Sequence, residues 1–436
     1  VLKKVLIVTY YFPPSGGAGV QRMLKLVKYI RQFGWEPIVY TAKDAEYPVI
    51  DESLFKDIPD GVTVLRNKIR EPYGFYKRFI GQKKNERVYS GFLSEHKTPS
   101  LAQRISVWLR GNLFIPDARM WWINPSVKFL TRYLRENPVD AILSSGPPHT
   151  THMIASGVKR KLNIPWLADF RDPWTRIDFY EQLHLTKWAD AKHKRLEKSV
   201  LTEADKVVTV SWQWAEEFER LGGRKVDVIT NGFDEDDYSK QNVKVDTKFS
   251  LVHVGSINPD RNPHTLWKVL SALLETMPGF KENLVIRLIG KNDSSIYNSI
   301  EQYSLTPYLE RVDYMPHSAV GREQQRAAVL LLLLNNTPNI SGIIPGKVFE
   351  YLAAKRPVLV IGSPKGDSAR IVRESNAGDT ADFNDFDSLQ RIIKNRFEQF
   401  QRGDLCVQST GIDQFSRLKM AEKFANALKE LNRNKV

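Results

Sequence analysis

The sequence predicts an α/β protein built from two doubly wound parallel sheets, and the pattern of apolar residues leads to that fold class. Short apolar segments, typical of buried parallel strands, alternate with segments of helical period along nearly the whole chain. The alternation runs twice, and a polar stretch near residues 236–248 separates the two runs. The length of 436 residues also suits two domains of roughly 200 residues each.

The first run opens with the apolar segment KVLIVTYY, which we expect to form a central strand. A helix follows over residues 20–34, because apolar side chains recur there at helical spacing and Gly34 ends the pattern. Further strands are expected at residues 36–42, 61–67, 140–145, 165–170, 206–211 and 225–232.

The second run repeats this logic and ends in an amphipathic helix. Its strands are expected at residues 249–255, 284–290, 311–316, 329–335 and 357–362. We therefore predict four parts: an N-terminal domain over 1–235, a linker over 236–248, a C-terminal domain over 249–412, and a closing segment, 413–436. The helix of the closing segment is expected to pack back toward the N-terminal domain.

Composition narrows the class of protein. The formal net charge of +14 calls for an anionic partner, but the basic residues are spread among helices and form no recognisable nucleic-acid motif, so we expect no nucleic acid. The single cysteine, Cys406, excludes an intrachain disulfide. The longest apolar run, residues 327–334, is too short to cross a bilayer, and the N-terminus does not read as a signal peptide. We expect a cytoplasmic protein.

In doubly wound sheets ligands bind beyond the carboxyl ends of the strands, so the loops there are the candidate sites. The first is PPSGGAG, residues 13–19, where the amides of Gly16 and Gly17 at a helix N-terminus suit a phosphate. A tight strand-to-helix turn is the alternative interpretation of the same glycines.

Two loops of the first half carry ionisable side chains. The segment ADFRDPW places Arg171 and Asp172 directly after an expected strand, and a salt bridge among its own residues is the alternative reading. His149 and His152 follow the preceding strand at an i, i+3 spacing. One such pair without further ligands does not predict zinc, and we expect no metal.

In the second half, the segment SGIIPGKVFEYLAAKRPVLVIG sets Lys347 and Glu350 one helical turn apart beside a glycine loop. Arg261 lies in the loop after the first strand of this half and is expected to point to the same place. Two cations and one carboxylate suit a diphosphate and a ribose. The alternative for Glu350 is a helix-start residue favoured only by the helix dipole.

These segments together resemble the retaining GT-B glycosyltransferases of glycosyltransferase family 4. The resemblance rests on VLIVTYYFPPSGGAGVQR, VITNGFD, VHVGSINPDRNP and PGKVFEYLAAKRPVLV, which occur in the family's order over nearly the full length. It implies a GT-B architecture, with two Rossmann-like domains facing across a cleft.

The resemblance assigns roles to residues of the second half. Glu350 matches the second glutamate of the family's E-x7-E motif, which binds ribose hydroxyls, whereas Gly342 stands at the first glutamate. Ser256 stands where the family often has a phosphate-binding arginine, and Arg261 matches its phosphate-binding lysine. Lys347 is expected to replace the lost cation. In the first half, Arg171 stands where many members have a histidine near the donor sugar.

The function that the resemblance implies is transfer of a sugar, with retention, from a nucleotide-diphosphate sugar to a glycan or polyprenyl-linked acceptor. No metal or other cofactor is implied, and the expected setting is cell-surface polysaccharide synthesis. Arg261, Lys347 and the amides of the glycine loop would neutralise the leaving diphosphate. Asp172 is the candidate base for the acceptor hydroxyl, with His149 as the alternative. A nucleotide-sugar 2-epimerase of the same fold and a non-catalytic basic binding protein are the competing functions.

Residues 66–135 form a long basic, aromatic segment between two expected strands. The pattern is typical of a surface in a membrane interface, so we expect a protein peripheral to the inner face of the cell membrane, on anionic lipid. The alternative is that the helical face of residues 101–109 packs on the domain core. The residues that carry the pattern are Tyr73, Phe75, Tyr76, Lys77, Arg78, Phe79, Lys83, Lys84, Leu101, Arg104, Ile105, Trp108, Leu109, Arg110, Phe114, Trp121 and Trp122. Of these, we expect Trp121 and Trp122 in the core or the acceptor cleft rather than as membrane anchors.

Overall fold

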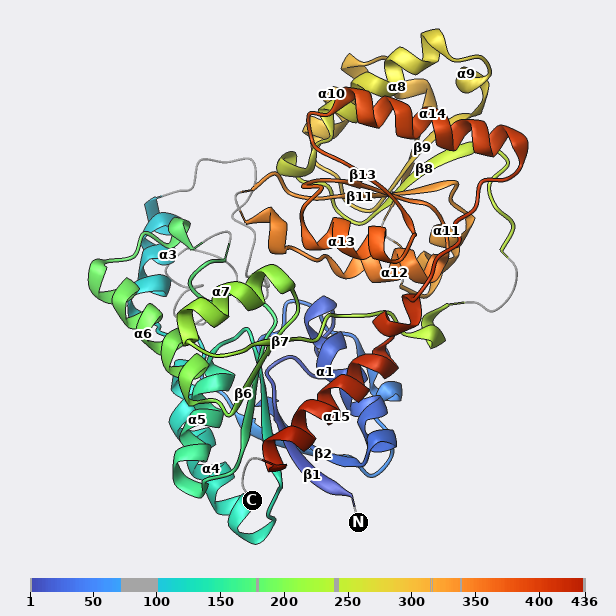
Figure 1. Cartoon of the computed structure of the whole chain (residues 1–436). Coiled ribbons are helices and arrows are strands. Elements are labelled where there is room, and N and C mark those ends of the chain that lie inside the picture. The colour runs from blue at the N-terminus through green and yellow to red at the C-terminus, as the bar shows by residue number, and fades with distance from the viewer. Residues whose placement is uncertain are drawn as a thin grey trace. The chain divides into compact units, whose positions relative to one another are not determined.

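The computed structural model describes residues 2–71, 101–177, 180–238, 243–313, 315, 317–337 and 339–433 (Figure 1). They form two compact units. The first consists of the chain up to Asn231 together with the segment from Arg417 on, and the second is Gly232–Ser416. Each unit contains one sheet of parallel strands. The predicted fold class, two doubly wound parallel sheets, is therefore confirmed.

The first sheet has the strand order β3-β2-β1-β4-β5-β6-β7 among the described residues. The order reverses between β1 and β4, so the loops that follow these two strands are neighbours at the carboxyl edge. The strands are β1 (Lys3–Val8), β2 (Trp35–Lys43), β3 (Thr63–Lys68), β4 (Ala141–Gly146), β5 (Trp166–Phe170), β6 (Lys206–Thr209) and β7 (Asp227–Val228).

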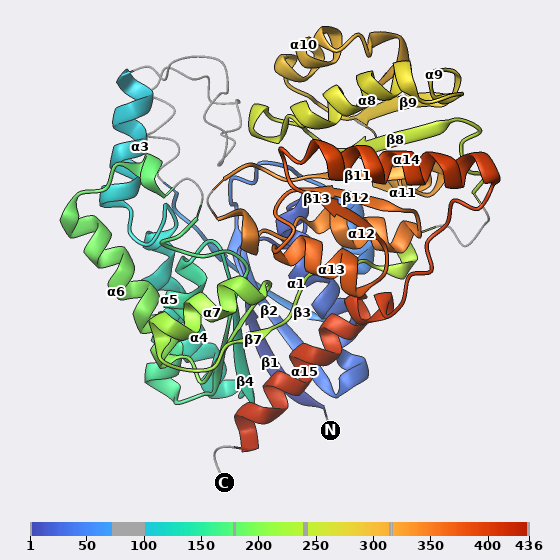
Figure 2. The same cartoon turned by 45° about the horizontal axis from the view of Figure 1, so that its top comes forward.

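Helices cover both faces of this sheet (Figures 1 and 2). Val5 and Ile7 of β1 pack in one core cluster with apolar residues of α1 and α15, which meet although they lie at opposite ends of the chain. The helices of the unit are α1 (Ala18–Tyr29), α3 (Leu101–Leu113), α4 (Ile123–Glu136), α5 (Thr150–Leu162), α6 (Lys187–Glu203), α7 (Trp212–Gly222) and α15 (Arg417–Arg433). The 3-10 helices are η1 (Ile30–Phe33), η2 (Glu52–Asp57), η3 (Met120–Trp122) and η4 (Glu181–Leu183).

The second sheet has the order β10-β9-β8-β11-β12-β13 in the described part of the chain. Its strands are β8 (Phe249–Val254), β9 (Leu284–Ile289), β10 (Leu309–Val312), β11 (Val329–Leu333), β12 (Val358–Ile361) and β13 (Gly378–Ala381). The α-helices are α8 (His264–Thr276), α9 (Phe280–Asn283), α10 (Ser294–Gln302), α11 (His317–Arg326), α12 (Gly346–Ala354), α13 (Asp367–Glu374) and α14 (Phe386–Arg402). The 3-10 helices are η5 (Glu235–Asp237), η6 (Pro259–Arg261), η7 (Thr306–Tyr308), η8 (Ile340–Gly342) and η9 (Ile412–Phe415). Apolar residues of α8, α10 and α14 form one core cluster against it.

The strand at the edge of the second sheet, β13, was not predicted from the sequence. Its residues are GDTA, of which only Ala381 is buried, so it lacks the apolar run that marks the central strands. Gly378 allows the edge to approach β12, because a Cβ atom there would lie 1.9 Å from the carbonyl oxygen of Val358. The seventh strand was predicted too long, over residues 225–232, whereas β7 is only Asp227–Val228.

The basic aromatic segment is described only in part. Tyr73, Phe75, Tyr76, Lys77, Arg78, Phe79, Lys83 and Lys84 lie outside the described residues. In the described part, Trp122 is buried and stacks on Tyr40 with ring centroids 5.3 Å apart, whereas Trp121 is half exposed. Leu101, Ile105 and Trp108 of α3 are exposed, so the alternative that this helical face packs on the domain core is wrong. Among the described helices, none has the length and apolar character needed to span a membrane.

A buried ion pair joins α1 to β5. Arg22 and Asp169 are both almost fully inaccessible to solvent, and the Nη2–Oδ1 distance is 2.7 Å. The guanidinium also donates to the carbonyl oxygens of Ile229 and Thr230, beyond β7, and the hydroxyl of Ser145 donates to Asp169 Oδ2. Asp169 therefore pairs with α1 and not with Arg171 of its own loop.

We predict that Arg22→Met destabilises the first unit by about 3–5 kcal/mol, because it leaves the Asp169 carboxylate buried without a cation. The matched control is Arg31→Met, which removes the partly exposed Arg31–Glu36 pair and should cost about 1 kcal/mol or less. Urea unfolding measures the free energy of unfolding of both variants, and hydrogen exchange of β5 and α15 shows whether the loss is in the first unit. Equal losses in the two variants would contradict the prediction.

Candidate functional site

The predicted cation Lys347 lies in the first turn of α12, and a histidine holds it. Its Nζ is 3.4 Å from Nε2 of His253, a buried residue of β8. His253 Nδ1 lies 2.9 Å from the carbonyl oxygen of Leu331, so Nδ1 carries the proton and Nε2 accepts from the ammonium. Burial, and then the charge of Lys347, hold the pKa of His253 well below its ordinary value. The imidazole is therefore a neutral acceptor.

A glycine makes room for the same ammonium. A Cβ atom at Gly255 would lie 2.4 Å from Lys347 Nζ and 2.7 Å from its Cε. Gly255 also has a φ of +108°, which side-chain-bearing residues rarely adopt. Any larger residue would displace the lysine, so the glycine after β8 and the lysine of α12 form one arrangement.

Lys347 titrates close to physiological pH. Burial and then the charge of Arg261 lower its pKa to about 8, against the opposing effect of Glu350. The charged form is thus costly where it stands, and an anionic ligand would stabilise it.

Arg261 ends the 3-10 helix η6 and is anchored to two loops. Its Nε donates to Oδ1 of Asn335, beyond β11, at 2.5 Å, and its Nη1 lies 3.4 Å from the carbonyl oxygen of Ser256. Ser256 itself is exposed. The charge of Arg261 lowers the pKa of Lys347, so the two cations lie close enough to interact, and their role at a diphosphate stays a prediction.

Glu350 is oriented by α11. Its Oε2 accepts a hydrogen bond of 3.0 Å from Nε2 of the buried Gln324, and the hydroxyl of Tyr238 lies 3.1 Å from the Glu350 carbonyl oxygen. α12 begins at Gly346 and has no acidic residue in its first turn. The alternative reading of Glu350 as a helix-start residue is therefore wrong.

Arg171, in the first unit, is engaged with backbone. Its Nη1 donates to the Gly19 carbonyl oxygen at 2.6 Å, its Nε to that of Gly146 at 3.3 Å, and its Nη2 to that of Pro147. Burial lowers its pKa, and the neighbouring Asp172 and Asp169 carboxylates oppose that shift. Arg171 thus ties the start of α1 to the loop after β4. Asp172 follows it in the chain and is half-buried.

His149 stands at the start of α5, in a buried aromatic cluster. Its ring stacks on Trp174 with centroids 4.4 Å apart, and its buried Nδ1 has no hydrogen-bond partner. Burial, and then the charge of His152, hold its pKa well below the ordinary value, so the ring is neutral at physiological pH. Burial also lowers the pKa of His152 to about 3. No group of three or more metal-ligating side chains occurs among the described residues.

The glycine loop before α1 has one of its two predicted amides engaged with backbone. The amide of Gly16 donates to the carbonyl oxygen of Val49 at 2.9 Å, so it is already engaged. Gly17 has a φ of +82°, precedes α1 as its N-cap, and has no atom within 4 Å of a Cβ position. The loop therefore forms a tight turn at the start of α1, and its role in binding a phosphate stays a prediction.

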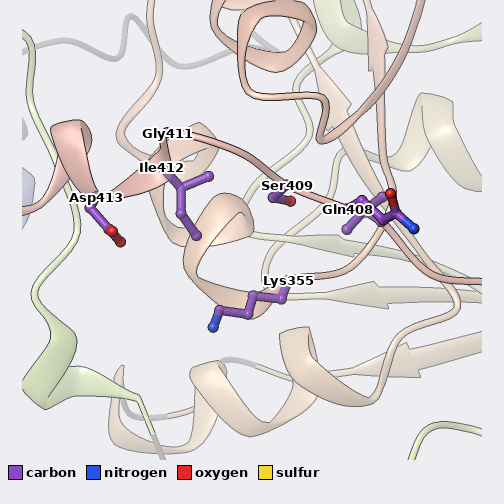
Figure 3. A pocket seen from close by; sticks show the side chains of 7 residues that line it. Lys355, Gln408, Ser409, Gly411, Ile412 and Asp413 are labelled. Carbon is purple, nitrogen blue, oxygen red and sulfur yellow. The ribbon is translucent and has the colours of Figure 1, made fainter.

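The sequence pattern alone missed His253, Gly255 and Arg22. One signal was present, since His253 interrupts the apolar strand FSLVHVG and Arg22 lies among the apolar residues of its helix. A pocket of about 310 Å³ elsewhere in the second unit is lined by none of the predicted site residues (Figure 3). Its lining consists of Lys355, Val407, Gln408, Ser409, Gly411, Ile412 and Asp413.

Comparison with known proteins bears on the family and the fold. Residues 16–232 match the family model described as "Glycosyl transferase 4-like domain". No curated protein matches the chain.

Solved structures share the fold over nearly the whole chain. The chain is similar to sucrose-phosphate synthase from Thermosynechococcus elongatus (TM-score 0.65, 13% identity, 99% of this chain and 100% of that one). It is also similar to Anabaena HepE in complex with UDP-glucose (0.61, 13%, 98% and 100%) and to a glycosyltransferase from Rickettsia africae (0.60, 14%, 99% and 99%). At such low identity these likenesses establish the fold. The chain thus has a GT-B fold, and its residues 16–232 match a glycosyl transferase 4-like domain.

Proposed function

We propose that the protein is a retaining, metal-independent glycosyltransferase that moves a sugar from a nucleotide-diphosphate donor to a glycan or lipid-linked glycan acceptor. The observation that carries the proposal is the pair of cations, Lys347 and Arg261, which share one electrostatic environment with the oriented carboxylate of Glu350. A diphosphate complements the first two groups, and ribose hydroxyls complement the third. The GT-B neighbour crystallised with UDP-glucose supports a donor of this class.

In this proposal the second unit stabilises the leaving group. As the bond between the anomeric carbon and the donor phosphate oxygen breaks, the electron pair stays on that oxygen, and charge grows on the diphosphate. Lys347 and Arg261 stabilise this charge, and they are held in place beforehand by His253 and Asn335. Ser256, exposed after β8, adds a hydroxyl to the same loop.

The first unit acts on the acceptor in this proposal. The acceptor hydroxyl loses its proton to the departing phosphate or to Asp172, while Arg171 holds the glycine loop and the loop after β4 together. Gly17 leaves an amide-bearing helix start open to an anion, and the neutral ring of His149 is the alternative base. Cell-surface polysaccharide synthesis in the cytoplasm is the setting we propose.

Two substitutions separate the diphosphate from the ribose. Lys347→Met should weaken binding of both UDP and inorganic pyrophosphate about 10- to 100-fold, because one charge-assisted contact is lost. Glu350→Gln should weaken UDP binding and leave pyrophosphate binding unchanged. A thermal-shift panel of nucleoside diphosphates first identifies the base that the protein binds, and this nucleotide replaces UDP if it differs. Calorimetry then measures both affinities. At about 100 times its Kd, the nucleotide should stabilise the fold by ~2.7 kcal/mol.

Lys281→Met, on exposed α9, is the matched control and should keep full affinity. If no nucleoside diphosphate binds the wild-type chain, the proposed donor class is wrong. If Lys347→Met binds UDP as tightly as the wild type, Lys347 has no role at the diphosphate.

The pH dependence of binding follows from the pKa of Lys347. Because this pKa is about 8 in the unliganded protein, the ammonium is charged below that value and neutral above it. Affinity for UDP should therefore be constant near pH 7 and fall as the pH rises through about 8. In Lys347→Met this fall should disappear. A wild-type affinity that stays constant to about pH 9.5 would contradict the assignment, since that range exceeds the lysine's titration.

Asp172→Asn tests the acceptor side. With a competent acceptor, the variant should lose transfer while its donor affinity stays within about twofold of the wild type, because an amide cannot accept the proton. Product analysis by NMR also distinguishes the competing 2-epimerase, which would convert the nucleotide sugar to its epimer without any acceptor. Full transfer by Asp172→Asn would return this residue to a structural role.

A further inference from the structure

One surface of the first unit combines exposed apolar rings with cations. Leu101, Ile105 and Trp108 follow one another at i, i+4 and i+7 along α3 and so form a single stripe. Leu101 is 73% exposed, and the other two are each 39% exposed. A stripe of this kind on a helix of a soluble domain normally faces the core. Its exposure indicates a binding surface.

The start of α6 lies beside the last turn of α3. The backbone amide of Thr186, the N-cap residue of α6, donates to Oδ1 of Asn112 in the last turn of α3 at 2.7 Å. Two residues later, Trp188 is 64% exposed, with the Lys192 ammonium 4.8 Å from the centre of its ring. Both views show α3 and α6 side by side (Figures 1 and 2).

The charges near these rings are mostly positive, although Glu181 of η4, which contacts α3, is exposed. α3 carries two arginines and no acidic residue, and its Arg104 is exposed. Lys187, beside Trp188, is exposed as well. The acidic residue nearest in the chain, Asp190, is neutralised by Lys194 at 2.8 Å. We call Leu101, Arg104, Ile105, Trp108, Lys187 and Trp188 the α3/α6 face.

We propose that the α3/α6 face docks the protein on an anionic phospholipid bilayer. Tryptophan side chains favour the boundary between headgroups and acyl chains, and lysine and arginine gain energy from anionic headgroups. A protein partner fits less well, because lysine is depleted in protein interfaces whereas basic residues flank these rings. The proposal rests on described surface residues alone, so it stands or falls independently of sugar transfer.

Docking through this face has a geometric consequence. Leu101, Ile105 and Trp108 lie along one line of α3, so the helix must lie flat in the interface and cannot insert by one end. The cations at its side then meet headgroup phosphates.

Vesicle flotation of the full chain tests the proposal. The chain should float with phosphatidylglycerol–phosphatidylethanolamine vesicles at about 50 mM salt, float much less at about 500 mM, and stay down with phosphatidylcholine vesicles, since salt screens the headgroup attraction. Trp108→Ser with Trp188→Ser should abolish flotation. Arg104→Glu with Lys187→Glu should weaken partitioning at least about fivefold for each cation removed.

The matched controls make the same change in charge or remove a similar apolar ring, but at surface sites away from the α3/α6 face. Lys128→Glu with Lys281→Glu alters the net charge equally at exposed sites on α4 and α9, and Phe55→Ser removes an exposed ring from η2. Both controls should float as the wild type does. All variants should retain the wild-type circular dichroism spectrum, because each substitution is at the surface.

Three results would overturn the proposal. The first is absence of flotation with anionic vesicles at low salt. The second is equal flotation with phosphatidylcholine, which would remove the anionic headgroup from the recognition. The third is unchanged flotation of folded variants of the α3/α6 face, which would place any lipid contact elsewhere. A chain that floats but binds no nucleoside diphosphate would refute only the proposed enzyme function.

Discussion

The buried ion pair between Arg22 and Asp169 stabilises the first unit near the point where its strand order reverses, between β1 and β4. Removing both charges from water costs several kcal/mol, so such a pair persists only when further hydrogen bonds satisfy its remaining donors and acceptors. Here the carbonyl oxygens of Ile229 and Thr230 and the hydroxyl of Ser145 do so. One guanidinium thereby joins α1, β5 and the chain just before it enters the second unit.

The same physical device recurs at the candidate site. Arg171 is partly buried against backbone carbonyl oxygens, and Lys347 is partly buried against a neutral imidazole. Within the described part of the chain, neither cation shows an ion pair of the kind that Arg22 makes with Asp169. The dipoles of carbonyl groups and of a neutral imidazole orient a cation without neutralising its charge, so the charge can still attract an anionic ligand. Burial is the main cause of the lowered pKa values of Arg171 and Lys347.

Much of the fold could be read from the sequence because parallel strands buried on both faces are apolar throughout. The segments around Val5, Leu251 and Leu331 therefore stand out. Short polar edge strands have no such pattern, which is why β13 was missed. Of the candidate site, the loops and the charged residues were predictable, since ligands bind at the carboxyl edges of such sheets. The hydrogen bonds of these residues were not, and the choice between Arg22 and Arg171 as the partner of Asp169 is the clearest instance.

The sequence by itself determined the two parallel sheets, the loops that can carry a site and the cations and carboxylates in them. These follow from hydrophobic period and from side-chain chemistry, which are local properties. Only the tertiary structure decided that Gly255 admits Lys347, that His253 accepts from it, and that the α3 stripe faces outward. Each of these depends on contacts between segments far apart in the chain or on the absence of such contacts, and local pattern carries no record of either.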